Sequence, residues 1–171
     1  SRVLLVDDTP ANIQVLAGTL KEKGYRISVA TSGRQALEVV GKVRPDLILL
    51  DVMMPDMDGF ETCHRLKASE ATRDIPVIFL TARTETGDIV KGFELGAVDY
   101  VAKPFNAHEL LARVHTHLTM DRLHRENERL LLSILPASIA ARLKSGDSGI
   151  ADHYAEASVL FADIVNFTVL S

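Results

Sequence analysis

The sequence has little of what secreted, membrane-spanning or nucleic-acid-binding proteins require. Its single cysteine, Cys63, excludes an internal disulfide and fits a reducing compartment. No apolar run approaches the ~18 residues that span a bilayer, and the first residues do not have the pattern of a signal peptide. The 19 Lys and Arg residues are outnumbered by 23 Asp and Glu residues and form no basic block. We therefore expect a soluble, cytoplasmic chain that binds neither membrane nor nucleic acid.

The residues that are present predict an α/β fold. Apolar residues make up 47% of the 171, enough for a core, and the length allows one domain of about 100–150 residues with an appendage. Short apolar runs at 2–6, 46–50, 76–80 and 98–102 alternate with helical patterns, which is typical of βα units in a parallel sheet. The first three runs are apolar without alternation, as expected for strands covered by helices on both faces. The alternating run at 25–30 predicts an edge strand.

Capping signals predict where the helices begin and end. Thr9 before Pro10 indicates an N-cap followed by a first-turn proline. Three further starts have a capping-box spacing, with Glu or Gln three residues after Ser32, Asp58 and Asn106. Glycines suited to helix C-caps stand at Gly24 and Gly96. Helices are therefore expected over 10–23, 33–43, 59–69, 87–95 and from 107 onward.

Four predicted strands end on side chains suited to phosphoryl chemistry. The first runs into Asp7 and Asp8, and the others run into Asp51, Thr81 and Lys103. In an open parallel sheet the ligand crevice lies outside the carboxyl ends of the strands. Each residue alone has an ordinary explanation, such as an aspartate pair that caps a helix or a lysine in solvent. Their joint occurrence at strand ends predicts one pocket with three carboxylates, a hydroxyl and an ammonium group.

Each of these groups fits a role in phosphoryl transfer. Asp51 is the best candidate nucleophile, since a carboxylate can accept a phosphoryl group as an acyl phosphate. Two anions must then meet, which requires a divalent cation, and Mg²⁺ binds through one or two carboxylates and several waters. We expect Asp8 and Asp51 to bind it directly, Asp7 to hold a ligand water, and a backbone carbonyl after Asp51 to complete the protein ligands. Thr81 and Lys103 are expected to stabilise the phosphoryl oxygens.

Residues 2–118 resemble a response-regulator receiver domain. The resemblance rests on the pair Asp7-Asp8, on Asp51 followed by Met53-Met54-Pro55-Asp56-Met57-Asp58-Gly59, on Thr81-Ala82, and on Tyr100 before Lys103-Pro104. It implies a doubly wound, five-stranded parallel sheet in the order 2-1-3-4-5 with five helices. It also implies Mg²⁺-dependent transfer from a sensor histidine kinase to Asp51, the Met53 carbonyl as a metal ligand, and a cis bond before Pro104.

The resemblance further implies a switch. A phosphoryl group on Asp51 would draw the Thr81 hydroxyl inward and leave space that Tyr100 can fill. The surface formed by the fourth helix, the fifth strand and the fifth helix would then repack. The alternative for Tyr100 is a partly buried aromatic side chain on an edge strand with no switching role.

The fifth helix is predicted to continue past the end of this domain, to residue 135. Its apolar positions follow a 3-4-3-4 spacing, with Asn127 at an a-type position, at Met120, Leu123, Asn127, Leu130 and Ile134. A single Asn at such a position favours a two-stranded coiled coil in fixed register. We therefore expect a parallel homodimer through residues 120–134. Two heptads are short for a coiled coil, and an amphipathic helix that lies on its own domain is the alternative.

Residues 126–171 resemble the entry to a class III nucleotide cyclase domain. The resemblance includes Glu126-Asn127, the run from Leu130 to Pro136, and Ser158-Val-Leu-Phe-Ala-Asp163-Ile-Val-Asn166-Phe-Thr168. It implies that Asp163 binds catalytic metals, although Asn166 stands where that motif usually has Gly. The second metal carboxylate and the base-recognising residues would lie beyond Ser171, and a two-metal mechanism needs both carboxylates. The chain by itself is therefore expected to have no cyclase activity.

The expected organisation is a receiver domain over 1–118, coiled-coil or transducer helices over 119–145, and an N-terminal cyclase fragment over 146–171. The expected function is a phosphorylation-controlled module that gates a cyclase. One alternative is an aspartate-based phosphatase, which typically carries a second Asp two residues after its nucleophile, where Met53 stands here. The other alternative is a stand-alone receiver adaptor that acts by protein–protein contact.

Overall fold

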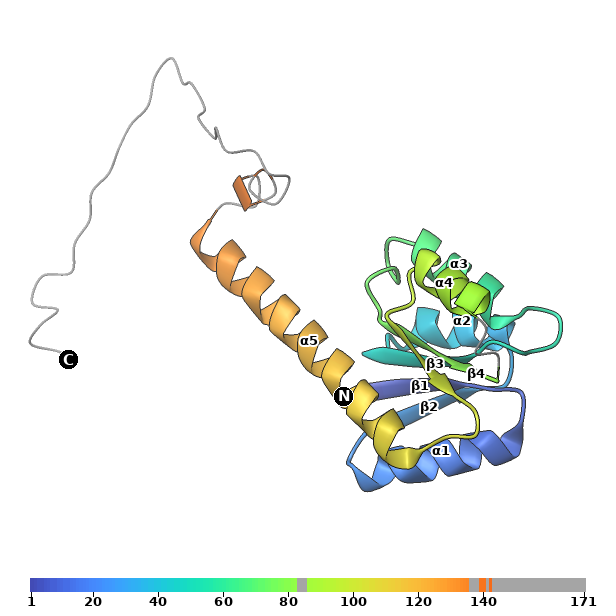
Figure 1. Cartoon of the computed structure of the whole chain (residues 1–171). Helices are drawn as coiled ribbons and strands as arrows, with labels where there is room; N and C mark the ends of the chain where they lie inside the picture. The colour runs from blue at the N-terminus through green and yellow to red at the C-terminus, as the bar shows by residue number, and fades with distance from the viewer. Residues whose placement is uncertain (83–85, 136–138, 141, 143–171) are drawn as a thin grey trace, which may run out of the picture. The chain divides into compact units, whose positions relative to one another are not determined.

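The computed structural model describes residues 1–82, 86–135, 139–140 and 142. The chain divides into two compact units, residues 1–126 and 127–171. In chain order the elements are β1 (Arg2–Val6), α1 (Pro10–Glu22), β2 (Arg26–Ala30), α2 (Gly33–Lys42), β3 (Leu47–Asp51), α3 (Gly59–Ala68), β4 (Val77–Thr81), α4 (Thr86–Glu94), β5 (Asp99–Ala102) and α5 (Ala107–Ile134) (Figure 1). The predicted elements are confirmed to within one or two residues at their ends.

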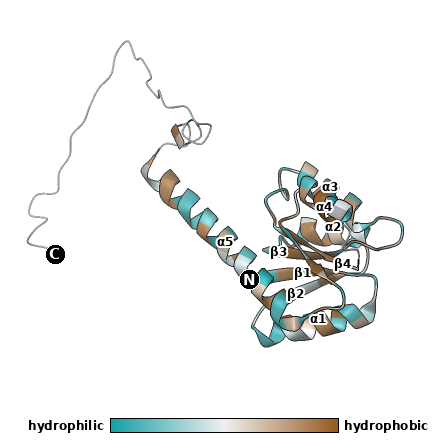
Figure 2. Ribbon diagram, viewed as in Figure 1, coloured by the Kyte–Doolittle hydropathy of each residue, from teal (hydrophilic) through white to brown (hydrophobic). Residues whose placement is uncertain are grey.

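The five strands form one parallel sheet in the order β2-β1-β3-β4-β5. This confirms the predicted fold class and strand order. The central strands β3 and β4 are buried along their whole length, whereas β2 at the edge is exposed or half-buried except at its last residue. Figure 2 shows the hydrophobic residues concentrated on the central strands. The contrast explains why β3 and β4 read as continuous apolar runs and β2 as an alternating one.

The sheet has a separate core on each face. On one face, α1 and α5 pack through Leu16, Leu20, Leu110, Val114 and Leu118 against alternate residues of the strands. On the other face, α2 and α3 pack against the intervening strand residues, and Figure 1 shows α4 on this side as well. Because helices cover both faces of the sheet, polar side chains on the central strands can reach solvent only where the strands end. The site is therefore confined to one edge of the sheet.

The predicted caps are mostly confirmed. The side chains of Ser32 and Asp58 accept hydrogen bonds from the backbone N–H groups of Gln35 (3.2 Å) and Glu61 (2.7 Å). Asn106 likewise accepts from the Glu109 N–H at 3.1 Å. Gly24 and Gly96 have φ of 81° and 90°, which suits glycine at a helix end.

The Thr9 side chain does not cap α1, contrary to the prediction. Thr9 occupies the N-cap position with Pro10 in the first turn, but its hydroxyl makes no capping bond. It donates instead to a carboxylate oxygen of Asp8 at 3.3 Å. A cap requires the hydroxyl oxygen to accept from a backbone N–H of the helix, and the Thr9 side chain is directed to Asp8 instead.

α5 is 28 residues long, about 42 Å at the rise of an α-helix. It carries exposed apolar side chains at Met120 and Leu123, and further along at Leu130 and Leu132. Across the described part of the chain, no helix is both long enough and apolar enough to cross a membrane.

Lys67 fastens the connection between α3 and β4. Its ammonium group donates to the backbone carbonyls of Arg73 (2.7 Å) and Ile75 (2.8 Å), just before β4 begins. Burial lowers the pKa of Lys67, although the nearby Cys63 and Asp74 act in the opposite direction. The turn at Gly96 lies against its methylenes, since a Cβ at Gly96 would be 3.2 Å from the Lys67 Cγ. One side chain thus links α3, the approach to β4 and the end of α4.

We predict that Lys67→Met destabilises the domain by about 2 kcal/mol, because it leaves two backbone carbonyls without their charged donor. Lys42→Met is the matched control, since Lys42 is exposed in the last turn of α2. Denaturant unfolding of both variants gives the comparison. Equal midpoints for Lys67→Met and Lys42→Met would contradict the role given to Lys67.

Candidate active site

Three carboxylates converge at the carboxyl ends of two neighbouring strands. β1 pairs with β3 with Val6 opposite Leu50, so Asp7 follows β1 beside Asp51 at the end of β3. Carboxylate oxygens of Asp7, Asp8 and Asp51 all lie within 4.8 Å of one another. Asp7 and Asp51 are buried, whereas Asp8 is exposed. The predicted acidic cluster is therefore present, with one carboxylate open to solvent.

Lys103 bridges the two buried carboxylates. Its ammonium group lies 2.7 Å from Oδ2 of Asp51 and 2.9 Å from Oδ2 of Asp7. It stands directly after β5, and its peptide bond to Pro104 is cis. The backbone N–H of Lys103 donates to the Thr81 carbonyl at 2.8 Å, which ties the ends of β4 and β5 together.

The two partners of this ion pair respond differently to burial. Burial raises the pKa of Asp51, and the hydrogen bond from Lys103 only partly offsets that rise. For Lys103, burial acts to lower the pKa, but the bonds to Asp51 and Asp7 exceed that effect and raise it. The partners differ too, because Lys103 is bonded to two carboxylates, whereas Asp51 has one ammonium group and the like charge of Asp7 near it. Further positive charge near Asp51 would therefore stabilise its ionised form, and a divalent cation supplies such charge.

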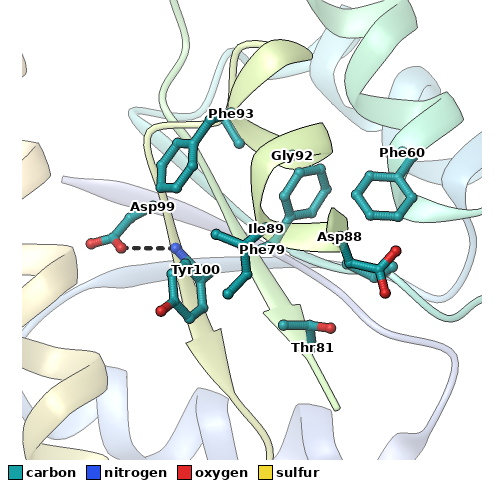
Figure 3. Close-up of a pocket in the computed structure, with 11 residues that line it drawn as sticks. Phe60, Phe79, Thr81, Asp88, Ile89, Gly92, Phe93, Asp99 and Tyr100 are labelled. Atoms are coloured by element: carbon teal, nitrogen blue, oxygen red, sulfur yellow. Dashed lines mark hydrogen bonds between the residues drawn. The ribbon is translucent and has the colours of Figure 1, made fainter. Parts of the chain in front are cut away.

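Thr81 ends β4, next to Asp51 on the neighbouring strand. β3 and β4 pair with Asp51 opposite Leu80, so the next residue, Thr81, follows at the same edge of the sheet. Its side chain is buried and lines a cavity of about 20 Å³ that is also lined by Phe79, Gly92 and Tyr100 (Figure 3). That volume is enough for roughly one water molecule. The structure thus brings Asp7, Asp8, Asp51, Thr81 and Lys103 to one edge, as the sequence predicted.

The loop after β3 passes very close to Asp51. The Met53 N–H donates to Oδ1 of Asp51 at 3.2 Å, and the Gly59 N–H donates to the Val52 carbonyl at 3.0 Å. A Cβ at Gly59 would lie 2.2 Å from the backbone oxygen of Asp51. Only glycine fits there. Gly59 had no predicted role of its own, although it directly follows the N-cap Asp58 and ends the stretch from Met53 that supports the receiver resemblance.

Asn12 is a second residue that the sequence analysis missed. From the first turns of α1, its side-chain amide donates to both carboxylate oxygens of Asp7. An Asn on a helix surface is common, and nothing in the sequence around Asn12 indicates its contact with Asp7.

Tyr100 lies on β5, at the edge of the cavity behind Thr81. Its ring is 6.4 Å from that of Phe93 in an edge-to-face arrangement, and the Arg113 guanidinium is 5.8 Å from its centroid. The Tyr100 N–H donates to Asp99 at 2.8 Å (Figure 3). Tyr100 is half-buried, beside Phe93 and Arg113.

Two α5 side chains hold Asp99. Arg113 donates to Oδ1 of Asp99 at 2.6 Å, and Nε2 of His117 lies 3.1 Å from Oδ2. Burial alone would raise the pKa of Asp99, but the bonds from Arg113, the Tyr100 N–H and His117 lower it below the usual value. Asp99 therefore links β5 to α5 as an ionised group.

The residues of the acidic cluster suit Mg²⁺. This ion is hard, prefers oxygen ligands, and is bound through one or two carboxylates with several waters retained. The three carboxylates supply oxygen at one point, and the exposed Asp8 leaves a route from solvent. Beside them lies an open cleft of about 490 Å³ lined by Asp8, Met53, Asp58 and Lys91 among others.

Comparison with known proteins decides the family. The sequence profile of the response regulator receiver domain matches residues 3–115. The chain belongs to the response regulator receiver family. The receiver is similar to a receiver domain of a sensor histidine kinase from Pseudomonas aeruginosa that was solved with a magnesium ion coordinated in its active site cleft. That structure is 35% identical with a TM-score of 0.64, and the match covers 69% of this chain and 97% of that one.

Other relatives carry the receiver within longer proteins. A probable cyclic di-GMP phosphodiesterase from Vibrio cholerae is 44% identical over 140 residues, which is 80% of this chain and 32% of that protein. The response regulator PleD from Caulobacter vibrioides is 42% identical over 148 residues, 84% of this chain and 32% of PleD. The DNA-binding response regulator MtrA from Mycolicibacterium smegmatis is 43% identical, with 78% of this chain and 56% of MtrA covered. The chain thus spans between a third and somewhat over half of these relatives.

The cluster of Asp7, Asp8 and Asp51 is typical of the Mg²⁺ site of a receiver, Mg²⁺ is the cofactor of this family, and the function of the chain is that of a phosphoacceptor receiver. Among the other predicted site residues, Asp163 lies outside the described residues. The predicted domain boundaries at 118 and 145 stay predictions.

We predict that Gly59→Ala destabilises the receiver by about 1–3 kcal/mol, because the added methyl group overlaps the Asp51 carbonyl. Mg²⁺ affinity should fall with it, since the backbone next to the acidic cluster has to move. The matched control is Gly18→Ala in α1, where a Cβ meets nothing within 4 Å and stabilises the helix by about 0.5–1 kcal/mol. Denaturant unfolding and a Mg²⁺ titration measure both effects. Similar behaviour of the two variants would refute the close-approach argument.

We predict a pH-dependent contribution of Asp99 to stability. Because folding lowers the pKa of Asp99, its contribution is complete above the unfolded value and is lost as the pH falls through the folded value. Asp99→Asn should therefore destabilise at neutral pH, by about 1–3 kcal/mol. The difference from wild type should be constant from neutral pH down to about 5 and should shrink only as the pH falls below the unfolded pKa of an aspartate, about 4. Asp74→Asn, at an exposed carboxylate, is the control; an Asp99→Asn difference that is constant with pH would contradict the assignment.

Proposed function

We propose that the receiver accepts a phosphoryl group on Asp51 from a sensor histidine kinase, and that this modification controls an output domain. A carboxylate oxygen of Asp51 forms the new O–P bond while the N–P bond of the donor phosphohistidine breaks. The electron pair of that bond stays on the imidazole nitrogen, which takes up a proton. Bound Mg²⁺ offsets the charge of the carboxylates and of the incoming phosphoryl group.

The arrangement around Asp51 supports this assignment. Lys103 holds Oδ2 of Asp51 at 2.7 Å and the Met53 N–H holds Oδ1 at 3.2 Å, so the nucleophile is fixed before a donor arrives. We assign the backbone carbonyl of Met53 to the metal. Thr81 and Lys103 are placed at the same edge of the sheet, where their hydroxyl and ammonium groups stabilise negative charge on phosphoryl oxygens.

An aspartate-based phosphatase is the weaker alternative. Such an enzyme needs an acid two residues after its nucleophile, and Met53 has no proton to give to a leaving group. The side chain of Met53 is 52% exposed at the mouth of the cleft. The lack of an acid at position 53 favours an acyl phosphate that persists long enough to act as a signal.

We assign the switch to Thr81 and Tyr100. The cavity between them has room for about one water molecule, and we propose that Tyr100 enters it when Thr81 moves toward Asp51. Phe93 and Arg113 hold the ring in its present place. Entry of the ring would weaken those contacts and change the surface of α4, β5 and α5.

For the output, we propose a class III nucleotide cyclase whose first residues are those that follow α5, with Asp163 as a metal ligand. The support is the sequence resemblance of residues 126–171. We further propose a parallel homodimer through residues 120–134. The exposure of Met120, Leu123 and Leu130, at 54–61%, supports it, because each leaves a large apolar side chain for a partner helix to cover. A stand-alone adaptor remains the alternative if no output follows.

A phosphorylation assay tests the assignment of Asp51. The wild type, incubated with acetyl phosphate and Mg²⁺, should gain one phosphoryl group by intact-mass spectrometry, and Asp51→Asn should gain none. Lys103→Met should slow the transfer by about 100-fold or more, as expected for loss of one preorganised charge-stabilising donor. Asp74→Asn is the control for a surface aspartate. Labelling of Asp51→Asn at the wild-type rate would place the acceptor elsewhere.

A further inference from the structure

Asn12 makes an unusual contact with the acidic cluster. Its amide nitrogen lies 3.0 Å from Oδ1 and 3.0 Å from Oδ2 of Asp7. Both carboxylate oxygens are acceptors, so the amide must present its NH₂ group to them rather than its oxygen. The contact is therefore directional, and it holds the plane of the Asp7 carboxylate as well as its position.

Two further hydrogen bonds satisfy the remaining acceptor sites of the Asp7 carboxylate. The Thr9 N–H donates to Oδ1 at 2.9 Å, and the Lys103 ammonium donates to Oδ2 at 2.9 Å. With the two contacts from Asn12, each oxygen has two donors, which matches the roughly four acceptor sites of a carboxylate. Asp7 is wholly buried. Asp8 is exposed, and its contact with the Thr9 hydroxyl is long, at 3.3 Å.

The position of Asn12 is rigid. It lies in the first turns of α1, which begins at Pro10, and the Ile13 N–H donates to the Thr9 carbonyl at 3.3 Å. The same helix is anchored to the sheet by the fully buried Leu16 and Leu20. A donor on this helix is preorganised and loses little freedom when it binds the carboxylate.

Asn12 is uncharged, and this affects the net charge of the acidic cluster. Three carboxylates against the single ammonium of Lys103 leave two negative charges at the cluster, which complements a divalent cation. A Lys or Arg at position 12 would also donate to Asp7 but would cancel part of that charge. An amide supplies the hydrogen bonds and leaves the attraction for the cation intact.

We propose that Asn12 is a positioning residue of the phosphoryl-transfer site. It fixes the Asp7 carboxylate so that Asp7 and Lys103 keep their places beside Asp51, and it leaves the exposed Asp8 as the carboxylate with free acceptor capacity for Mg²⁺. The inference rests on the proposed function of the cluster. It assigns to α1 a part in metal binding that the acidic residues themselves do not reveal.

Mg²⁺ affinity tests the proposal. Asn12→Leu removes the donor at similar volume, and loss of a hydrogen bond that supports the surroundings of a metal site weakens metal binding by about 10–100-fold. Gln14→Leu is the matched control, because Gln14 is an exposed amide on the same helix. Isothermal titration with MgCl₂ on the full chain gives the dissociation constants, and thermal unfolding without Mg²⁺ gives the stability of each variant. A residue with a purely structural role would lower stability and leave the dissociation constant unchanged.

A measurement on the wild type covers the case in which Asn12→Leu does not fold. The side-chain NH₂ protons of Asn12 should exchange with water at least about tenfold more slowly than those of Gln14, as expected for donors held by a buried acceptor. Their resonances should also shift when Mg²⁺ is added. Equal exchange rates for the two amides, or equal Mg²⁺ affinity of Asn12→Leu and Gln14→Leu, would overturn the proposal.

The outcome separates this proposal from the function on which it rests. Wild type that binds no Mg²⁺ and takes no phosphoryl group from acetyl phosphate would defeat the proposed function. Wild type that does both, together with an Asn12→Leu variant of unchanged Mg²⁺ affinity, would defeat only the role of Asn12.

Discussion

The contact of Lys103 with two buried carboxylates is the constraint on which the site depends. Two anions at the ends of adjacent strands repel each other, and burial deprives them of solvent that would screen the repulsion. One ammonium group within 3 Å of both removes much of that penalty. The chain therefore folds with its acidic cluster assembled. It still retains a negative excess, because the single ammonium group of Lys103 faces three carboxylates.

The sheet explains why these groups meet. With both faces covered by helices, β3 and β4 are buried throughout and offer polar side chains a place only where the strands stop. Parallel pairing puts those stops at one edge, and the registers of β1–β3 and β3–β4 set Asp7 and Thr81 on either side of Asp51. The chemistry is therefore a consequence of strand length and direction. The loops that follow adjust it over short distances, as the close approach of Gly59 to the Asp51 carbonyl illustrates.

Much of this could be predicted from sequence, for definable reasons. Buried strands are continuous apolar runs, so the residues that end them, such as Asp51 and Thr81, stand out. The edge strand β2 alternates because one side of it is solvated, and it was placed correctly. Contacts that depend on side-chain direction were not visible. The Thr9 hydroxyl turned to Asp8 instead of the helix N-terminus, and the contact of Asn12 with Asp7 requires the geometry at the start of α1. Both depend on the direction in which a side chain points, which residue spacing does not encode.

The continuity of α5 has a mechanical consequence. Arg113 and His117 bind Asp99, and Met120 follows three residues after His117, so all three lie on one face of α5. No loop interrupts α5 between these residues. A movement of Asp99 would therefore be passed to α5 through Arg113 and His117. The Met120 side chain would change its orientation together with them, because all three residues belong to the same continuous helix.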